Sequence, residues 1–255
     1  MQKNSIYKKA LYLAVPMMIQ NGITNAVSLV DNLMVGSLGT EKMTAVSIAG
    51  QLFFVFFLAV FGGLSGPGIY SAQYFGQGNK EGYQKIFRLK VWITALLTVV
   101  GIIVFIVGGE WLIGLYLKGS GGNLDAGLTL ESALSYLHIM LIGLVPFAIT
   151  QVYAGSLREM GESMKPMLAG LVSVVVDIVF NYFLIYGKFG FPRLEVKGAA
   201  IATVMARFAE MFVVIIWTHA EIEKYSFLKN VYRTLRISLQ ESSLMSFYGQ
   251  VVWQC

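Results

Sequence analysis

The stretch Ser28-Leu29-Val30-Asp31-Asn32-Leu33-Met34-Val35-Gly36 places a carboxylate inside a long apolar run. Between Lys9 and Glu41, Asp31 is the only ionised side chain. The apolar part, residues 10–35, is long enough to span a bilayer, which needs about 20 residues. A carboxylate inside such a span costs on the order of 2.5–3.5 kcal/mol and usually turns toward a polar partner or water. Asp31 is therefore a candidate functional residue.

The other polar residues of this segment share a helical face with Asp31. They recur at steps of three or four residues, the spacing that stacks side chains along one side of a helix. The set is Gln20, Asn21, Thr24, Asn25, Ser28, Asp31 and Asn32. One wall of the predicted helix therefore faces lipid or apolar protein, while the other lines a polar space. A second interpretation is that the amides and hydroxyls only join helices through hydrogen bonds.

The composition indicates a membrane protein. Hydrophobic residues make up 56% of the 255-residue chain and charged residues 13%, against about 25% charged residues in soluble domains. The mean hydropathy is +0.66. The net charge of +5 is concentrated between the apolar runs, which favours a membrane surface over nucleic acid as its partner. The single cysteine, Cys255, excludes a disulfide framework and a thiolate metal site, and no catalytic motif predicts an enzyme.

Charged residues divide the chain into six apolar segments, which predict an all-α polytopic membrane protein with a six-helix bundle over residues 1–220. The expected spans are residues 10–35, 46–64, 91–109, 133–153, 167–186 and 199–217. Gly66-Pro67-Gly68 is expected to end the second span, and a basic connector over residues 80–90 to precede the third. Residues 221–236 are predicted to form a cytoplasmic linker, and residues 237–255 the truncated start of a seventh helix.

The distribution of Lys and Arg predicts the orientation of the chain. Most of these residues lie on the side of the membrane that also carries both termini, and Arg207 falls within a span. Because loops rich in positive charge stay in the cytoplasm, both termini are predicted to be cytoplasmic, with the chain in the cell's inner (plasma) membrane.

Two further polar sets lie inside the later spans, again at helical spacing. They are Ser173, Asp177 and Asn181 in the fifth span, and Thr203, Arg207 and Glu210 in the sixth. A carboxylate near the middle of the bilayer is rarely a passive feature, so Asp177 joins Asp31 as a candidate. Arg207 and Glu210 are expected to neutralise each other as a structural ion pair. Buried carboxylates among polar stripes suit the binding of a proton or another cation, and no cofactor or metal centre is predicted.

Four stretches together resemble the multidrug and toxic compound extrusion (MATE) transporters. Residues 30–36 look like that family's opening motif, and residues 72–78, Ala-Gln-Tyr-Phe-Gly-Gln-Gly, like the element after its second helix. Residues 155–167 resemble the loop between helices four and five, and residues 197–203 resemble the start of helix six. The four motifs occur in the family's order across most of the chain.

The resemblance implies a cation-coupled antiporter, driven by H⁺ or Na⁺, that exports organic and often cationic compounds. Asp31 matches the first-helix carboxylate that takes part in cation coupling in that family. The family's fifth helix commonly carries an Asn and, four residues on, an Asp; here the order is reversed, Asp177 then Asn181, and both are expected at the cation site. The adjacent cavity is expected to be lined by Gln20, Asn21, Asn25, Ser28, Ser173 and Thr203.

The family is built from two six-helix lobes related by an axis along the membrane normal. This chain holds one lobe, so the expected partners are a missing second lobe or a second copy, together with membrane lipid and small organic substrates. Alone, the half-length chain is expected to be inactive. Two other functions stay open: a lipid-linked oligosaccharide flippase, which favours a strongly basic cavity, and a non-transporting scaffold whose polar stripes only hold helices together.

Overall fold

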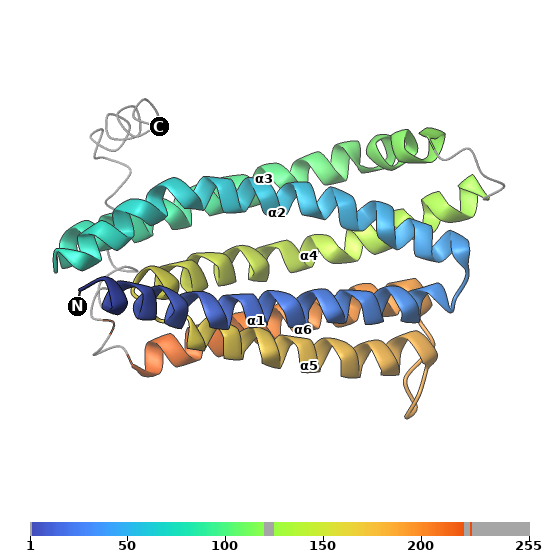
Figure 1. The fold of residues 1–255 in the computed structure, drawn as a ribbon. Helices are drawn as coiled ribbons and strands as arrows, with labels where there is room; N and C mark the ends of the chain where they lie inside the picture. The colour runs from blue at the N-terminus through green and yellow to red at the C-terminus, as the bar shows by residue number, and fades with distance from the viewer. Residues whose placement is uncertain (1, 120–124, 222–224, 226–255) are drawn as a thin grey trace.

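The computed structural model describes residues 2–119, 125–221 and 225, which form six helices and no strand. The helices are α1 (Gln2–Gly36), α2 (Thr40–Gly76), α3 (Lys80–Gly119), α4 (Ala126–Glu159), α5 (Met164–Tyr186) and α6 (Glu195–Ala220). Figure 1 shows them lying side by side, with successive helices running in opposite directions. Each is long and apolar enough to cross a membrane. The predicted six-helix membrane bundle is confirmed, and the chain is a multi-pass membrane protein.

Several helices extend beyond the predicted spans. α2 continues through Pro67 to Gly76, so the prediction that Gly66-Pro67-Gly68 ends this helix is wrong. Pro67 is buried, and neighbouring helices in a membrane bundle compensate for the backbone bond that a proline removes. The chain turns instead at Gly78, whose φ of +69° favours glycine. Residues 80–90, predicted as a connector, form the first turns of α3.

Part of the predicted organisation lies outside the described residues. Of the predicted linker, residues 221–236, the structure describes Glu221 and Tyr225, and the predicted seventh helix over residues 237–255 is not among the described residues. Lys165 of α5 contacts both of those linker residues, with its Nζ 2.5 Å from a Glu221 carboxylate oxygen and 2.8 Å from the Tyr225 hydroxyl. This contact ties the chain that leaves α6 to the start of α5.

Buried apolar side chains of α2 and α4, together with those of the helices beside them, form the core. Glycines let these helices approach each other closely. A Cβ on Gly101 of α3 would lie 2.7 Å from the ring of Phe56 on α2. A Cβ on Gly198 of α6 would lie 2.6 Å from the backbone oxygen of Leu184 on α5. Small residues at such crossings are typical of membrane helices, whose association depends on close packing.

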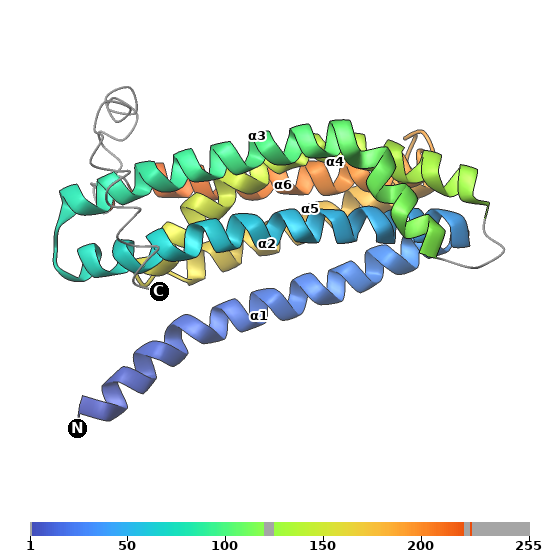
Figure 2. The same cartoon turned by 90° about the horizontal axis from the view of Figure 1, so that it is seen from above.

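α1 is less buried in the bundle than the other helices. Figure 2 shows that it diverges from the bundle toward its N-terminal end. Its other end is held by the buried Val35 and by a hydrogen bond of 3.2 Å between the hydroxyls of Ser37 and Tyr186 of α5. The side of α1 away from the bundle exposes the apolar residues Leu11, Tyr12, Met18, Leu29 and Leu33. The polar face of α1 is therefore the one that meets the rest of the molecule.

Candidate functional site in the polar cavity

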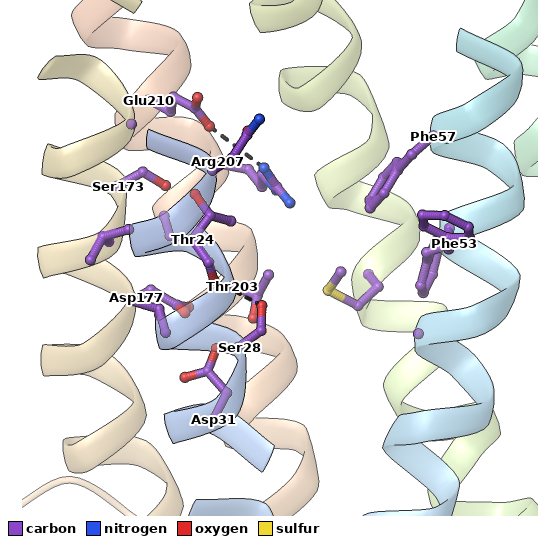
Figure 3. Close-up of a pocket in the computed structure, with 18 of the residues that line it drawn as sticks. Thr24, Ser28, Asp31, Phe53, Phe57, Ser173, Asp177, Thr203, Arg207 and Glu210 are labelled. Atoms are coloured by element: carbon purple, nitrogen blue, oxygen red, sulfur yellow. Dashed lines mark hydrogen bonds and ion pairs between the residues drawn. The ribbon is translucent and has the colours of Figure 1, made fainter. Parts of the chain in front are cut away.

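A cavity of about 790 Å³ lies among α1, α2, α4, α5 and α6. Its walls differ in chemistry. Figure 3 shows carboxylates, hydroxyls and a guanidinium on one side, from α1, α5 and α6, and the rings of Phe53 and Phe57 of α2 on the other. Phe54 and Phe61 extend the aromatic wall. The cavity therefore combines an apolar aromatic surface with a charged one.

The polar wall contains nearly all of the residues that the sequence singled out. Those lining the cavity are Gln20, Asn21, Ser28, Asp31, Ser173, Asp177, Asn181, Thr203, Arg207 and Glu210. They come from α1, α5 and α6, and α1 lies far from the other two in the sequence, since Asp31 and Asn181 are separated by 150 positions. Helical spacing predicted which residues share a face, and the fold brings the three faces together.

Asn25 is the exception, because it is exposed and does not line the cavity. Thr24 lies near the middle of the lining part of α1, and the next residue is turned from it by about 100° around the helix. Asn32, on the same side as Asn25, marks the edge of the lining. The prediction that Asn25 lines the cavity is therefore wrong, because the rotation of α1 against α5 leaves it just beyond that edge.

Asp31, Asp177 and Asn181 form a cluster of polar side chains on the cavity wall. The Asn181 side-chain N–H donates to an Asp31 carboxylate oxygen at 2.8 Å. Asp177 is 7% exposed and in electrostatic contact with Asp31. One carboxylate oxygen of Asp177 and the amide oxygen of Asn181 are buried without a hydrogen-bond partner among the described residues. Buried acceptors of this kind require a donor or a cation, and oxygen ligands suit hard cations.

Arg207 lies one turn and Glu210 two turns beyond Thr203 on the same wall. The Arg207 guanidinium is 3.6 Å from a Glu210 carboxylate oxygen, the contact expected from their spacing. The guanidinium also lies 5.6 Å from the ring centroid of Phe57 and 5.2 Å from that of Phe147. Arg207 is thus in contact with both the charged wall and the aromatic wall.

Two features of the cavity were not predicted from the sequence. Phe53, Phe57 and Phe61 recur every four residues, so helical spacing was sufficient to predict the aromatic face of α2. Arg158 belongs to residues 155–167, which resemble a loop between two helices, but it lies in α4, lines the cavity and donates to the Gln20 side-chain oxygen at 3.2 Å. Its reach into the cavity depends on packing between α4 and α1, which the sequence pattern does not contain.

A second buried polar cluster lies outside this cavity, between α3 and α4. Lys90, only 1% exposed, forms an ion pair with Glu159. The Tyr83 hydroxyl donates to the Ser156 backbone oxygen at 2.9 Å beside this pair. On α2, a Cβ at Gly68 would lie 2.8 Å from the Glu159 carboxylate. The cluster joins α3 to α4 beside Gly68 of α2.

The comparisons with known proteins agree with this arrangement. The MatE family model matches residues 16–183. "Probable multidrug resistance protein NorM" of Thermotoga maritima is 29% identical over 203 residues, which cover 80% of this chain and 42% of that protein. The protein of the same name from Synechocystis sp. is 28% identical over 240 residues, covering 92% and 50%. The chain therefore spans about half the length of the curated relatives it matches.

The fold is also shared with a solved structure. It is described as the outward-facing conformation of a multidrug resistance MATE family transporter of the MOP superfamily. The TM-score is 0.72 at 23% sequence identity, and the match covers 94% of this chain and 54% of that one. At this identity the likeness shows the arrangement of the helices.

Proposed function

Because the chain belongs to the MatE family of multidrug and toxic compound extrusion transporters, we propose that it forms one lobe of a cation-coupled antiporter for organic cations. The observation that carries this proposal is the buried set Asp31, Asp177 and Asn181 beside an aromatic wall. Relatives named multidrug resistance proteins support the export of drugs. An antiporter exchanges two ligands. The polar set suits the coupling cation, and the aromatic wall suits the organic cation.

In this proposal, Asp31, Asp177 and Asn181 bind the coupling cation, H⁺ or Na⁺. Two carboxylates in one buried site repel each other unless a proton or cation lies between them. Asn181 orients Asp31 through its N–H and offers its own oxygen as a further ligand. Gln20, Asn21, Ser28, Ser173 and Thr203 supply the polar surroundings of the adjacent cavity.

The organic cation occupies the space between the two walls. Aromatic rings attract a cation placed over their faces, and the nearby carboxylates supply the counter-charge. Organic cation and coupling cation therefore compete for the same negative charge. Coupling between two ligands is reciprocal. If the coupling cation lowers the affinity for the drug, bound drug lowers the affinity for the coupling cation, which is then released.

The proposal also includes the location and orientation of the lobe in the cell. The excess of Lys and Arg on one set of loops supports cytoplasmic termini in the inner (plasma) membrane. Alternating access requires one helix bundle to rock against another around a shared site. One lobe therefore binds its ligands but does not transport them without a second bundle.

The two alternative functions receive less support from the cavity. A flippase for lipid-linked oligosaccharides favours a strongly basic cavity, but here Arg158 and Arg207 are accompanied by the acidic Asp31, Asp177 and Glu210. A scaffold needs its buried polar groups paired, whereas one Asp177 oxygen is without a partner among the described residues. We therefore favour the antiporter.

Cation binding by the purified 255-residue chain tests the proposal. Titration calorimetry with Na⁺ and measurement of proton release with a pH electrode should detect one coupling cation in the wild type and none in Asp31→Asn or Asp177→Asn. The matched control is Asp125→Asn, because Asp125 caps α4 outside the cavity and asparagine caps equally well. Unchanged cation binding in both cavity variants, with a lower melting temperature, would support the scaffold instead.

A further inference from the structure

Arg207 is the cavity residue whose contacts the proposed function does not explain. Its guanidinium lies over the rings of Phe57 and Phe147, 5.6 and 5.2 Å from their centroids, and 3.6 Å from a Glu210 carboxylate oxygen. Figure 3 shows Arg207 reaching from the charged wall into the space that Phe57 faces. An ion pair with Glu210 alone does not require this position beside two rings that pack on each other, with 4.2 Å between their centroids.

These contacts are the ones by which a protein recognises an organic cation. A delocalised cation is attracted when it lies within about 6 Å of a ring centroid, and the attraction is strongest in a site sheltered from water. A neighbouring carboxylate completes such a site, and here Glu210 takes that part, while Asp177 acts electrostatically on Arg207 from a greater distance. Arg207 therefore already makes the contacts that a bound drug would make.

We propose that Arg207 is a tethered competitor, an internal cation that fills the aromatic side of the cavity until an organic cation displaces it. This inference rests on the proposed function and adds the class of ligand that is selected. A planar aromatic cation offers the rings more contact than a guanidinium does and displaces it. A compact alkylammonium ion offers less and is excluded.

The chain supplies a matched control in Arg158. It lines the same cavity and carries the same charge, but its guanidinium donates to Gln20 at 3.2 Å. Arg158→Gln and Arg207→Gln therefore remove one positive charge from the same space, and only the second vacates the two rings. Arg207→Lys adds a comparison at constant charge, because an ammonium ion keeps the pairing with Glu210 but stacks on rings less well than a planar guanidinium.

The experiment measures the binding of ethidium, a planar aromatic cation, and of tetraethylammonium to the full chain in lipid nanodiscs. The variants are wild type, Arg207→Gln, Arg207→Lys, Arg158→Gln, Phe57→Leu, and Arg207→Gln combined with Phe57→Leu. Arg207→Gln should tighten ethidium binding about tenfold, as expected for the loss of a sheltered cation–π competitor. Arg207→Lys should tighten it about threefold, and Arg158→Gln less than either. The gain from Arg207→Gln should shrink when Phe57 is also replaced.

The outcomes separate this inference from the function on which it rests. If the wild type binds ethidium but Arg207→Gln tightens binding no more than Arg158→Gln, only the charge matters and the tethered competitor is overturned. Tighter tetraethylammonium binding than ethidium binding in the wild type overturns it as well. Absence of ethidium binding in every variant overturns the proposed function together with the inference. Should Arg207→Gln fail to fold, Arg207→Lys decides, because unchanged ethidium affinity in that variant contradicts the proposal.

Discussion

Asn181 illustrates how one amide sets the geometry of a charged site. Its N–H donates to Asp31 at 2.8 Å across the contact between α1 and α5, while its oxygen stays free of described partners. In the proposed cation site, the same side chain thus orients one ligand, Asp31, and supplies another through its own oxygen. An apolar residue at this position would neither donate nor accept a hydrogen bond, and a third carboxylate would accept one but not donate one.

Replacing Asn181 with Leu should weaken cation binding about 10- to 100-fold, since a hydrogen bond to a charged group contributes about 1.5–3 kcal/mol. Titration calorimetry on the purified chain measures this change. Asn25→Leu is the matched control, because Asn25 is exposed and outside the cavity lining, and it should bind the cation like the wild type. An equal loss in both variants would contradict the assigned geometry.

The residue scale also shows how far the site was predictable. Steps of three and four residues identified the faces of Asp31, Asp177 and Arg207, because side-chain direction in a helix follows from spacing alone. Whether a residue at the edge of a face reaches the cavity depends on how the helix is rotated against its neighbours. Asn25 was therefore predicted in the lining and Arg158 was not, and the structure has them the other way round.

At the scale of helices, composition identified the six elements but not their ends. A Gly-Pro-Gly sequence ends most soluble helices, yet α2 passes through Pro67 because its neighbours compensate for the lost bond. Residues 80–90 were predicted to be a basic connector because the sequence does not show which charged residues pair with each other in the fold. Lys90 is buried since Glu159, 69 positions later, neutralises it.

The pair between Lys90 and Glu159 should be essential for the packing of α3 on α4. Lys90→Met leaves Glu159 buried without its counter-charge, which should destabilise the fold by about 3–5 kcal/mol. Thermal unfolding in detergent measures the change. Replacing both residues, with Met at 90 and Leu at 159, should recover most of the stability. A single Lys90→Met variant as stable as the wild type would show that the pair is dispensable.

The close approach of α5 and α6 at Gly198 gives a second prediction at this scale. A Cβ there would lie 2.6 Å from the Leu184 backbone oxygen, and backbone atoms cannot rotate away. Gly198→Ala should therefore force the helices apart and cost about 1–3 kcal/mol of unfolding free energy. Gly114→Ala is the control, because a Cβ there meets nothing within 4 Å. Equal stability of the two variants would contradict the packing.

At the scale of the whole molecule, the position of α1 is the feature that bears most directly on the cavity. It contributes Asp31 to the cavity yet diverges from the bundle toward its N-terminal end, as Figure 2 shows. One side of the cavity is therefore closed by the helix that is least buried in the bundle. The C-terminal end of α1 is held in the core by Val35, so the part of α1 that diverges from the bundle is its N-terminal part.

Reconstituted alone in liposomes, the 255-residue chain should bind its cation but produce no ethidium-driven change in internal pH or Na⁺. Alternating access needs two helix bundles, and the described residues form a single six-helix bundle. Fluorescent pH and Na⁺ indicators trapped in the liposomes measure this. Transport with a rate that rises as the square of protein density would contradict the prediction and establish a working pair of identical chains.

The central claim is that Asp31, Asp177 and Asn181 hold a coupling cation that an organic cation displaces. The most direct measurement adds ethidium to the purified chain in weakly buffered solution, with and without Na⁺, and follows the released H⁺ or Na⁺ with ion-selective electrodes. The account predicts release of about one cation for each ethidium bound by the wild type, and no release from Asp31→Asn or Asp177→Asn. Ethidium binding without any cation release, or release that persists in both variants, would contradict it.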